Sequence, residues 1–328
     1  MTAPVGLAVI GTGFGARVVA PGFAATEGVD VISVVSARDE TAVAAAVADP
    51  RVDLVSVHSP PFLHDRHVRI ALDAGRSVLC DKPFTPSAET SRRLVADARD
   101  SPGVHLLNFE FRFDPLRERT RDLVAAGVLG RIEHVVWTHH SAGSREPLRP
   151  YGWLFDRERA GGWIGAWASH AVDILRFTFG EIDSVVRSVP RLTVTHRPDP
   201  DDPDGPWHEC TAEDGLSALL TLHGGATVTI DSTFAASATL PPRITVVGSD
   251  ATLENVADRS LTVRDASGAL DDLTITTPES TGDHHAGAMT AFAVAVRDAV
   301  RNGEAAPSVP TFADGLACDE ILDRLRAG

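Results

Sequence analysis

The stretch LCDKPFTP, residues 79–86, contains the single lysine of the chain, Lys82; the other 29 of its 30 basic residues are arginines. An arginine supplies positive charge equally well, but it keeps its proton near neutral pH. A lysine releases its proton readily when it is desolvated or placed beside other cations. Lys82 is therefore a candidate for proton transfer or for Schiff-base chemistry.

A histidine and two tryptophans recur with helical spacing in AGGWIGAWASHAVDILRF, residues 160–177. The positions of Trp163, Ala166, Trp167 and His170 are three or four apart, which predicts one stripe along a helix. The ordinary pKa of a histidine lies near neutrality, so His170 is a candidate general acid or base. The two tryptophans either line a pocket for a flat sugar ring or belong to the core.

Three further side chains are candidates for contact with a substrate. Tyr151 is the single tyrosine of the chain and acts either as a proton donor or as a packing residue. His139 and His140 end a predicted strand in WTHHSAG, and alternate strand residues face opposite ways, so at most one of them reaches a substrate. His140 is taken as the candidate. The loop GDHHAG, residues 282–287, precedes a predicted helix and is placed to close over the pocket.

A glycine-rich turn follows the first apolar run, VGLAVI. Gly11, Gly13 and Ala16 fit the pattern G-x-G-x-x-G/A, in which the first glycine permits a tight turn and the second lets a pyrophosphate approach the backbone. A small third residue lets the following helix pack on the strand. The predicted cofactor-binding residues of this turn and of the later loops are Gly11, Gly13, Phe14, Gly15, Ala16, Ser36, Arg38, Ser59, Pro60, His64, Asp81 and Lys82.

The end of the second strand bears on the choice of cofactor. An NAD site usually places a carboxylate there to hold the ribose 2′-hydroxyl. Here the strand VDVISVV is followed by Ser36, Ala37 and Arg38, and an arginine suits a 2′-phosphate. NADP is therefore favoured over NAD, while Asp39 keeps NAD open.

Short strands alternate with helices over residues 5–111, which predicts a doubly wound parallel sheet of the Rossmann type. Ligands of such sheets bind at the carboxyl ends of the strands, where Ser59 and Lys82 both fall. From residue 130 onward strands come with few helices, including one expected at 272–276, which predicts an open, mainly antiparallel sheet. The expected domains are 1–118 and 119–328, with the last helix packing back near the first domain.

Several of these motifs, in this order, resemble the family of glucose–fructose oxidoreductases, inositol dehydrogenases and rhizopine-catabolism proteins (Gfo/Idh/MocA). They are GTGFGA, HSPPFLH, DKP, FEFRFDPLRERTRDLVAAGVLGRI and AGGWIGAWASHAVDILRFTFGE. The resemblance implies hydride transfer between NAD(P) and a secondary alcohol or ketone of a sugar, polyol or related cyclic substrate. It also implies that Lys82 and His170 handle the proton, and that a homodimer or homotetramer forms through the second-domain sheet.

The chain departs from the family pattern at three places. The aspartate expected four residues before His170 is Ala166, which removes a proton acceptor or imidazole orienter. Asp81 replaces the glutamate of E-K-P. The segment 36–52 is about half its usual length, which predicts one helix, a shortened sheet edge and a more open adenine pocket. A cofactor-binding regulator without catalysis, the use that a yeast repressor of galactose genes makes of this fold, and a reductase of a non-carbohydrate substrate therefore stay open as alternatives.

Composition narrows the class of protein. A formal charge of −15 argues against a nucleic-acid partner. No apolar run approaches the ~20 residues of a membrane helix, and no targeting segment precedes the first strand. Three separated cysteines without metal-ligand spacing fit a reduced cytoplasm, and no metal is expected. The proline- and aspartate-rich connection at 196–209 lacks the spacing of an EF-hand loop and is expected to be a solvated loop.

Overall fold

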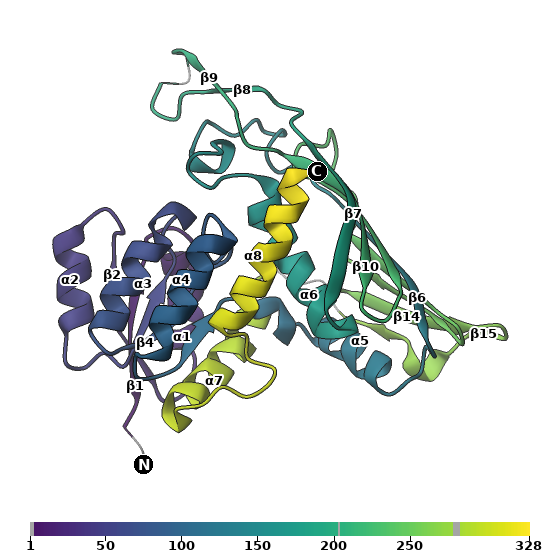
Figure 1. The fold of residues 1–328 in the computed structure, drawn as a ribbon, viewed down its shortest axis with the longest axis horizontal. Helices are drawn as coiled ribbons and strands as arrows, with labels where there is room; N and C mark the ends of the chain where they lie inside the picture. The colour runs from purple at the N-terminus through teal and green to yellow at the C-terminus, as the bar shows by residue number, and fades with distance from the viewer. Residues whose placement is uncertain (1–2, 203, 278–282) are drawn as a thin grey trace. The chain divides into compact units, whose positions relative to one another are not determined.

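The protein is described by a computed structural model covering residues 3–202, 204–277 and 283–328 (Figure 1). By compactness the chain divides into two units. The first comprises Met1–Phe113 with Ser280–Glu320, and the second comprises Asp114–Glu279 with Ile321–Gly328. Among the described residues, no helix combines the length and apolar character needed to cross a bilayer.

The described part of the first unit contains a five-stranded parallel sheet with the order β2-β1-β3-β4-β5. Helices α2, α3 and α4 pack together on one face, and α1 packs with α7 on the other (Figure 1). Its strands are β1 (Val5–Ile10), β2 (Val29–Val35), β3 (Leu54–Val57), β4 (Ser77–Cys80) and β5 (His105–Leu107). Its helices are α1 (Ala20–Ala24), α2 (Glu40–Ala48), α3 (His64–Asp73), α4 (Ala88–Arg99), α7 (Ala286–Asn302) and the start of α8 (Phe312–Ala327).

The sequence explains why these strands are central. β1 reads as a continuous apolar run and is buried along its whole length, as expected for a parallel strand covered on both faces. Phe292 and Val296 of α7 belong to the same core cluster as Leu7 and Val9 of β1. The segment between β2 and β3 contains α2 as its one helix, and β2 is an edge strand. The predicted doubly wound sheet and its shortened edge are thereby confirmed.

The second unit is built on a nine-stranded sheet along the path β15-β14-β13-β12-β6-β11-β10-β7, with β16 paired to β14. Every neighbouring pair is antiparallel except β6 with β11, which confirms the predicted mainly antiparallel sheet. The strands are β6 (Ile132–His140), β7 (Ile182–Arg191), β10 (Gly215–Leu222), β11 (Thr227–Thr233), β12 (Arg243–Gly248), β13 (Thr252–Val256), β14 (Ser260–Asp265), β15 (Gly268–Ala269) and β16 (Ile275–Thr276). The helices are α5 (Pro115–Ala125), α6 (Ser169–Phe179) and the end of α8.

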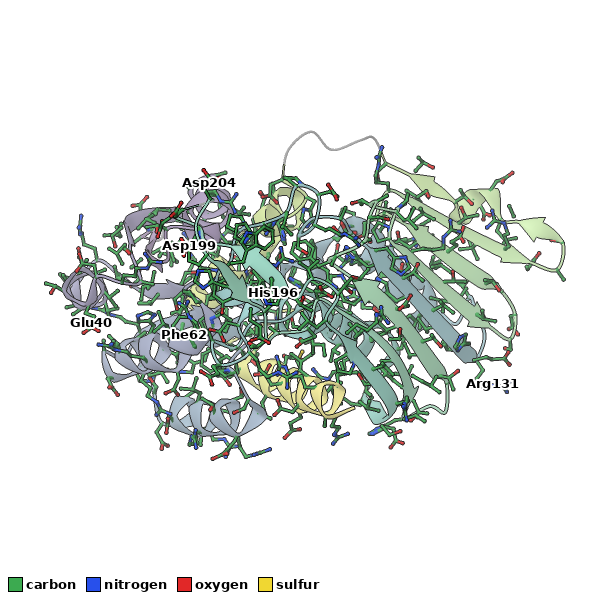
Figure 2. All side chains as sticks on the ribbon, turned by 90° about the horizontal axis from the view of Figure 1, so that it is seen from above. Glu40, Phe62, Arg131, His196, Asp199 and Asp204 are labelled. Atoms are coloured by element: carbon green, nitrogen blue, oxygen red, sulfur yellow. The ribbon has the colours of Figure 1, made fainter. Side chains whose placement is uncertain are left out.

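The structure corrects two expectations for this unit, the first entirely and the second in part, since Asp201, Asp202 and Asp204 are exposed as expected for a solvated loop. The strand expected at 272–276 is a helical turn, Asp271–Leu273, followed by the two-residue strand β16. The segment 196–209 forms a hairpin of β8 (His196–Pro198) and β9 (Trp207–Glu209), whose turn carries Asp199 and Asp204 (Figure 2).

A buried arginine anchors the β8–β9 hairpin. The Arg197 side chain donates to the carbonyls of Ser144 (2.6 Å) and Arg149 (3.1 Å), and its guanidinium lies 3.7 Å from the Phe155 ring centroid. Proline and aspartate dominate the composition of the hairpin turn, so the sequence pattern gave no sign of this anchor.

Asp319 of α8 fixes the start of that helix within the first unit. Its carboxylate is 2% exposed and accepts hydrogen bonds from the Thr85 backbone N–H (3.0 Å) and the Ser91 hydroxyl (2.6 Å). Asp319→Ala would leave both donors buried without this acceptor, so the free energy of unfolding should fall by about 2–3 kcal/mol.

Urea unfolding followed by circular dichroism measures this loss. The matched control is Asp323→Ala, one turn further along α8, where the side chain is 40% exposed and bonds to Arg326. The control should change stability by less than about 0.5 kcal/mol. Equal unfolding midpoints for the two variants would contradict the role of Asp319.

Candidate functional site

The glycine turn after β1 combines two tightly packed glycines with one that faces open space. Gly11 has φ +136°, and a Cβ there would lie 2.4 Å from the His58 carbonyl oxygen. A Cβ on Gly15 would lie 2.9 Å from Val9 Cγ1, whereas a Cβ on Gly13 would meet nothing within 4 Å. Gly11 and Gly15 are therefore required by the fold. Gly13 leaves a space of the kind that a ligand phosphate needs for close approach.

The carboxyl end of β2 carries two charged side chains with different surroundings. The Asp39 carboxylate caps α2 by accepting the Ala42 backbone N–H (2.9 Å). The Ser36 hydroxyl oxygen accepts the Arg38 backbone N–H (3.3 Å), and the Arg38 side chain is exposed. The capping bond gives Asp39 a structural partner on its own helix.

The loops after β3 and β4 are joined by a buried histidine. The His64 ring, fully buried, contacts the Ser59 carbonyl through Nε2 (2.7 Å) and the Phe84 carbonyl through Nδ1 (3.0 Å). Burial lowers the pKa of His64, against the opposing effects of a nearby carboxylate and of these backbone bonds. The Ser59 hydroxyl contacts His67 Nδ1 (3.0 Å), and Pro60 precedes the short helical turn that leads into α3. His64 thus holds the loops after β3 and β4 together, and Ser59 and Pro60 belong to the first of these loops.

Asp81 and Lys82 follow β4 directly. One Asp81 carboxylate oxygen accepts the backbone N–H of Lys82 (2.9 Å) and the side-chain amide of Asn108 (3.1 Å). The other oxygen lies 3.2 Å from His58 Nδ1. Burial alone would raise the pKa of Asp81, but the attraction and hydrogen bond of His58, with the charges of Lys82 and His64, hold that pKa well below its usual range. Asp81 is therefore a carboxylate at neutral pH.

A fully buried carboxylate, Glu110, lies on the same side of the first unit and was not predicted from the sequence. Glu110, in the short helical segment Glu110–Phe113 after β5, is fully buried and lies 2.5 Å from His285 Nδ1. The His285 ring stacks on Phe111 (ring centroids 4.9 Å apart) and meets the edge of Phe14 (5.0 Å). The two partners are 175 positions apart in the chain, so no spacing pattern connects them.

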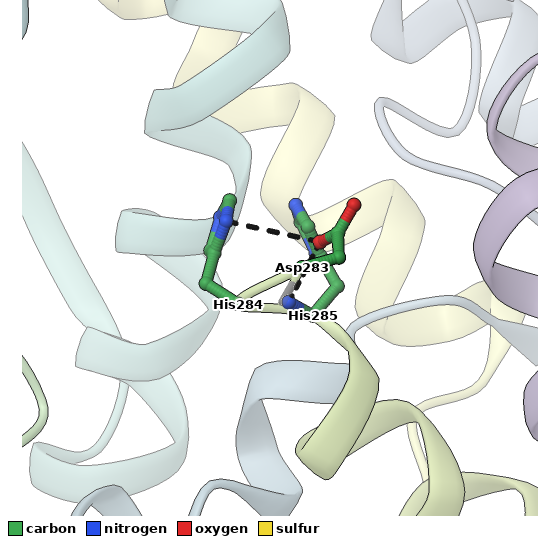
Figure 3. Close-up of side chains that lie close together, drawn as sticks. All are labelled: Asp283, His284 and His285. Atoms are coloured by element: carbon green, nitrogen blue, oxygen red, sulfur yellow. Dashed lines mark hydrogen bonds and ion pairs between the residues drawn. The ribbon is translucent and has the colours of Figure 1, made fainter. Parts of the chain in front are cut away.

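His285 also belongs to a group of three adjacent polar residues. Asp283, His284 and His285 place one possible metal-ligating atom each within 4.8 Å of one another (Figure 3). Asp283 accepts the backbone N–H of His285 (3.0 Å), which accounts for its position at the start of α7. Of the loop expected to close over a pocket, Gly282 lies outside the described residues.

In the second unit, the two tryptophans of the helical stripe form an aromatic cluster. The Trp163 ring stacks on Phe234 (4.5 Å, 4°) and on Trp167 (6.0 Å, 9°). The indole N–H of Trp163 donates to the Ser232 hydroxyl (2.8 Å). His170, on α6, is 6% exposed. Trp163 begins the helical turn Ile164–Ala168 that precedes α6, so cluster and histidine share one continuous helical segment.

The structure changes the choice between the two histidines at the end of β6. His139 packs edge-on against Trp163 (5.8 Å) and Trp167 (5.1 Å). His140, the candidate taken from the sequence, contacts Asp231 on β11 (3.0 Å), and strand alternation places it on the opposite face from His139. His139, not His140, therefore lies beside the tryptophans.

Tyr151 lies apart from this aromatic cluster. Its ring stacks on His208 of β9 (5.0 Å, 26°), and its backbone N–H donates to the Pro198 carbonyl (2.8 Å). Burial and the neighbouring Asp156 raise the pKa of Tyr151. The phenol therefore stays protonated at neutral pH and helps to fix the β8–β9 hairpin.

The candidate residues thus form two groups, one in each unit. The first unit brings the glycine turn, Ser59, Asp81 and Lys82 to the carboxyl ends of its parallel strands. The second unit brings the two tryptophans, His139 and His170 to one helical segment and the strand end beside it. Lys82 belongs to the first unit and His170 to the second.

Comparison with known proteins places the chain in a family. Residues 5–109 match a model described as an oxidoreductase family with an NAD-binding Rossmann fold. Residues 118–254 match a model described as the GFO/IDH/MocA C-terminal domain. The chain belongs to the Gfo/Idh/MocA family of oxidoreductases, and its first domain is an NAD(P)-binding Rossmann domain.

Individual relatives are similar over parts of their length. An uncharacterized oxidoreductase of Synechocystis sp. is 33% identical over 232 residues, covering 66% of this chain and 62% of the relative. A D-xylose 1-dehydrogenase (NADP(+)) of Haloferax volcanii is 32% identical over 191 residues, covering 58% and 53%. The chain thus spans about half to two thirds of the length of these curated relatives. A solved structure of levoglucosan dehydrogenase with NADH and L-sorbose superposes with a TM-score of 0.86 at 21% identity, covering 98% of this chain and 96% of that one.

Replacement of the open Gly13 should affect nucleotide binding, whereas replacement of the tightly packed Gly15 should affect stability. Gly13→Ala should leave stability unchanged, since its Cβ meets open space, but should weaken NADPH and NADH binding at least about tenfold by blocking phosphate approach. Gly15→Ala should instead lower stability by about 1–3 kcal/mol, because its Cβ collides with Val9.

Cofactor titration by nucleotide fluorescence and urea unfolding of both variants separate these effects. A Gly13→Ala protein that binds both nucleotides as tightly as the wild type would show that the open space beside Gly13 is not the phosphate site.

Proposed function

We propose that this protein is an NAD(P)-dependent oxidoreductase that transfers a hydride between nicotinamide and a secondary alcohol or ketone of a sugar, polyol or related cyclic substrate. The observation that carries the proposal is Lys82. It is the single lysine of the chain, it stands at the carboxyl end of β4, and it adjoins a carboxylate kept charged by buried partners. The names of the xylose and levoglucosan dehydrogenases support the substrate class.

The residues of the first unit fit a dinucleotide. The space beside Gly13 would take the pyrophosphate. Ser59 and Pro60, in the loop after β3, would flank the nicotinamide end. The bound nicotinamide supplies or accepts the hydride. The protein has to orient the carbinol carbon and to provide a place for the hydroxyl proton.

We assign the proton step to Lys82. In ketone reduction its ammonium donates a proton to the carbonyl oxygen as negative charge develops there, and in alcohol oxidation its amine takes the hydroxyl proton. His170 stays a second candidate for acid–base work, on the helical segment of the second unit that also carries the two tryptophans. Trp163 and Trp167 offer flat faces to a sugar ring. Since Ala166 replaces the family aspartate one helical turn before His170, the proton role falls to Lys82.

NADP is the proposed cofactor. The Arg38 side chain is exposed at the end of β2, where a 2′-phosphate would lie, while the carboxylate of Asp39 caps α2. The charge and fork geometry of a guanidinium suit a phosphate.

Replacement of Arg38 tests this choice. Arg38→Ala should weaken NADPH binding about tenfold or more and leave NADH binding nearly unchanged, because only the former carries the 2′-phosphate. Fluorescence titration with both nucleotides gives the two dissociation constants. A similar loss for both would assign Arg38 to adenine stacking instead.

Replacement of Lys82 tests the proton role. Lys82→Met should lower kcat at least about hundredfold on whichever panel substrate the wild type turns over, with the nucleotide dissociation constant nearly unchanged. Lys82→Arg keeps the charge and loses the ability to give up a proton. The readout is nicotinamide absorbance with a panel of sugars and polyols; full activity in Lys82→Arg would contradict proton transfer by Lys82.

Ala166 favours one alternative, a cofactor-binding regulator without catalysis. Tight nucleotide binding with no turnover on sugars, polyols or cyclic ketones would support that alternative. If the protein binds the nucleotide tightly, fails to turn over any of these compounds, but does reduce an imine or another non-carbohydrate, it is still an oxidoreductase with a different substrate.

Assembly through the second-unit sheet is proposed as well. Val186 and Val189 of β7 and Leu219 of β10 are 55%, 43% and 37% exposed, an unusual exposure for large apolar strand residues. A second copy of the chain covering this face would form a homodimer or, with a further interface, a homotetramer.

A further inference from the structure

His58 occupies a buried position between two polar side chains of the first unit. It follows β3 by one residue, and its side chain is completely buried. Its Nε2 lies 2.7 Å from the Ser56 hydroxyl oxygen, and its Nδ1 lies 3.2 Å from an Asp81 carboxylate oxygen. The imidazole therefore contacts a hydroxyl through one ring nitrogen and lies at ion-pair distance from a carboxylate through the other.

The Asp81 carboxylate continues this series of polar contacts toward Lys82. One carboxylate oxygen lies beside His58, and the other accepts the backbone N–H of Lys82. The carboxylate thereby fixes the position of the Lys82 backbone nitrogen. The aspartate is one methylene shorter than the glutamate of the E-K-P pattern. His58 brings an imidazole nitrogen to within 3.2 Å of this shorter side chain from the neighbouring strand end.

We propose that His58 is a positioning residue that holds the Asp81 carboxylate charged and in one orientation, and thereby fixes Lys82 where it transfers a proton. The inference rests on the proposed function of Lys82. His58 acts through Asp81, and its buried ring has no route to a substrate. Among the described residues, the titratable groups that face Asp81 are His58, Lys82, Cys80 and, from α3, His64.

The single lysine permits a direct test that needs no substrate. Labelling with ¹³Cε-lysine gives one lysine side-chain resonance, that of Lys82, whose chemical shift responds to the charge beside it. In the wild type this shift should stay constant from about pH 7 to pH 5, because Asp81 remains ionised. In His58→Ala it should show an inflection in about that range, since a largely buried carboxyl that loses the neighbour lowering its pKa takes up a proton at higher pH.

Matched variants assign the inflection. His58→Asn keeps an N–H donor near the Nδ1 position and should restore the flat profile. The double variant His58→Ala with Asp81→Asn should lose the inflection, which excludes His64 as its source. His105→Ala, at the opposite end of β5 from this site, is the control for loss of a partly buried histidine and should match the wild type. If the Lys82 chemical shift of the folded His58→Ala variant stays constant from about pH 7 to pH 5, the proposal is overturned.

Kinetics give the second readout. His58→Ala should lower kcat about tenfold to hundredfold with KM and the nucleotide dissociation constant nearly unchanged, and His58→Asn should recover most of the loss. Unchanged kcat in His58→Ala overturns the proposal. A wild-type protein without turnover counts against the proposed function, and the lysine resonance then still decides whether His58 holds Asp81 and Lys82 as inferred.

Discussion

The largely buried negative charge of Asp81, whose side chain is 14% exposed, is the constraint around which the site of the first unit is organised. A carboxylate at the end of a parallel strand is unfavourable without partners, because burial penalises the charged form. Here an asparagine from the loop after β5 and the following backbone N–H donate to it, and a histidine from the next strand end lies 3.2 Å from its other oxygen. The segments that follow β3, β4 and β5 therefore all contact one carboxylate. These contacts fix the position of the Lys82 backbone.

The glycine turn after β1 is constrained by its close packing against His58. Gly11 lies against the carbonyl of His58, and Gly15 lies against the Cβ of the same residue (3.0 Å from a Cβ at Gly15). The backbone that would cradle a pyrophosphate thus packs on the residue that bonds to Asp81. In the proposed function, the residues for the cofactor and the residues for the proton step therefore meet at His58.

Local patterns predicted much of this arrangement. The apolar run of β1 followed by glycines, and the short segment between β2 and β3, indicated the sheet, its edge and the side on which Lys82 lies. Pairs far apart in the chain, such as Glu110 with His285, were not predictable, because no periodicity joins them. The choice between His139 and His140 depended on strand register, which the sequence does not define. Arg197 was missed because its buried partners are backbone carbonyls of a distant loop.

In the proposed reaction a hydride passes to or from a nicotinamide while Lys82 moves the proton. The most direct measurement is incubation with NADPH deuterated at C4 and a panel of sugar ketones, followed by mass spectrometry of the products. The account predicts one deuterium on the carbinol carbon with the wild type and none above background with Lys82→Met. Equal deuterium transfer by both proteins would contradict the role of Lys82, and no transfer by the wild type from either face of the nicotinamide would contradict the proposed activity itself.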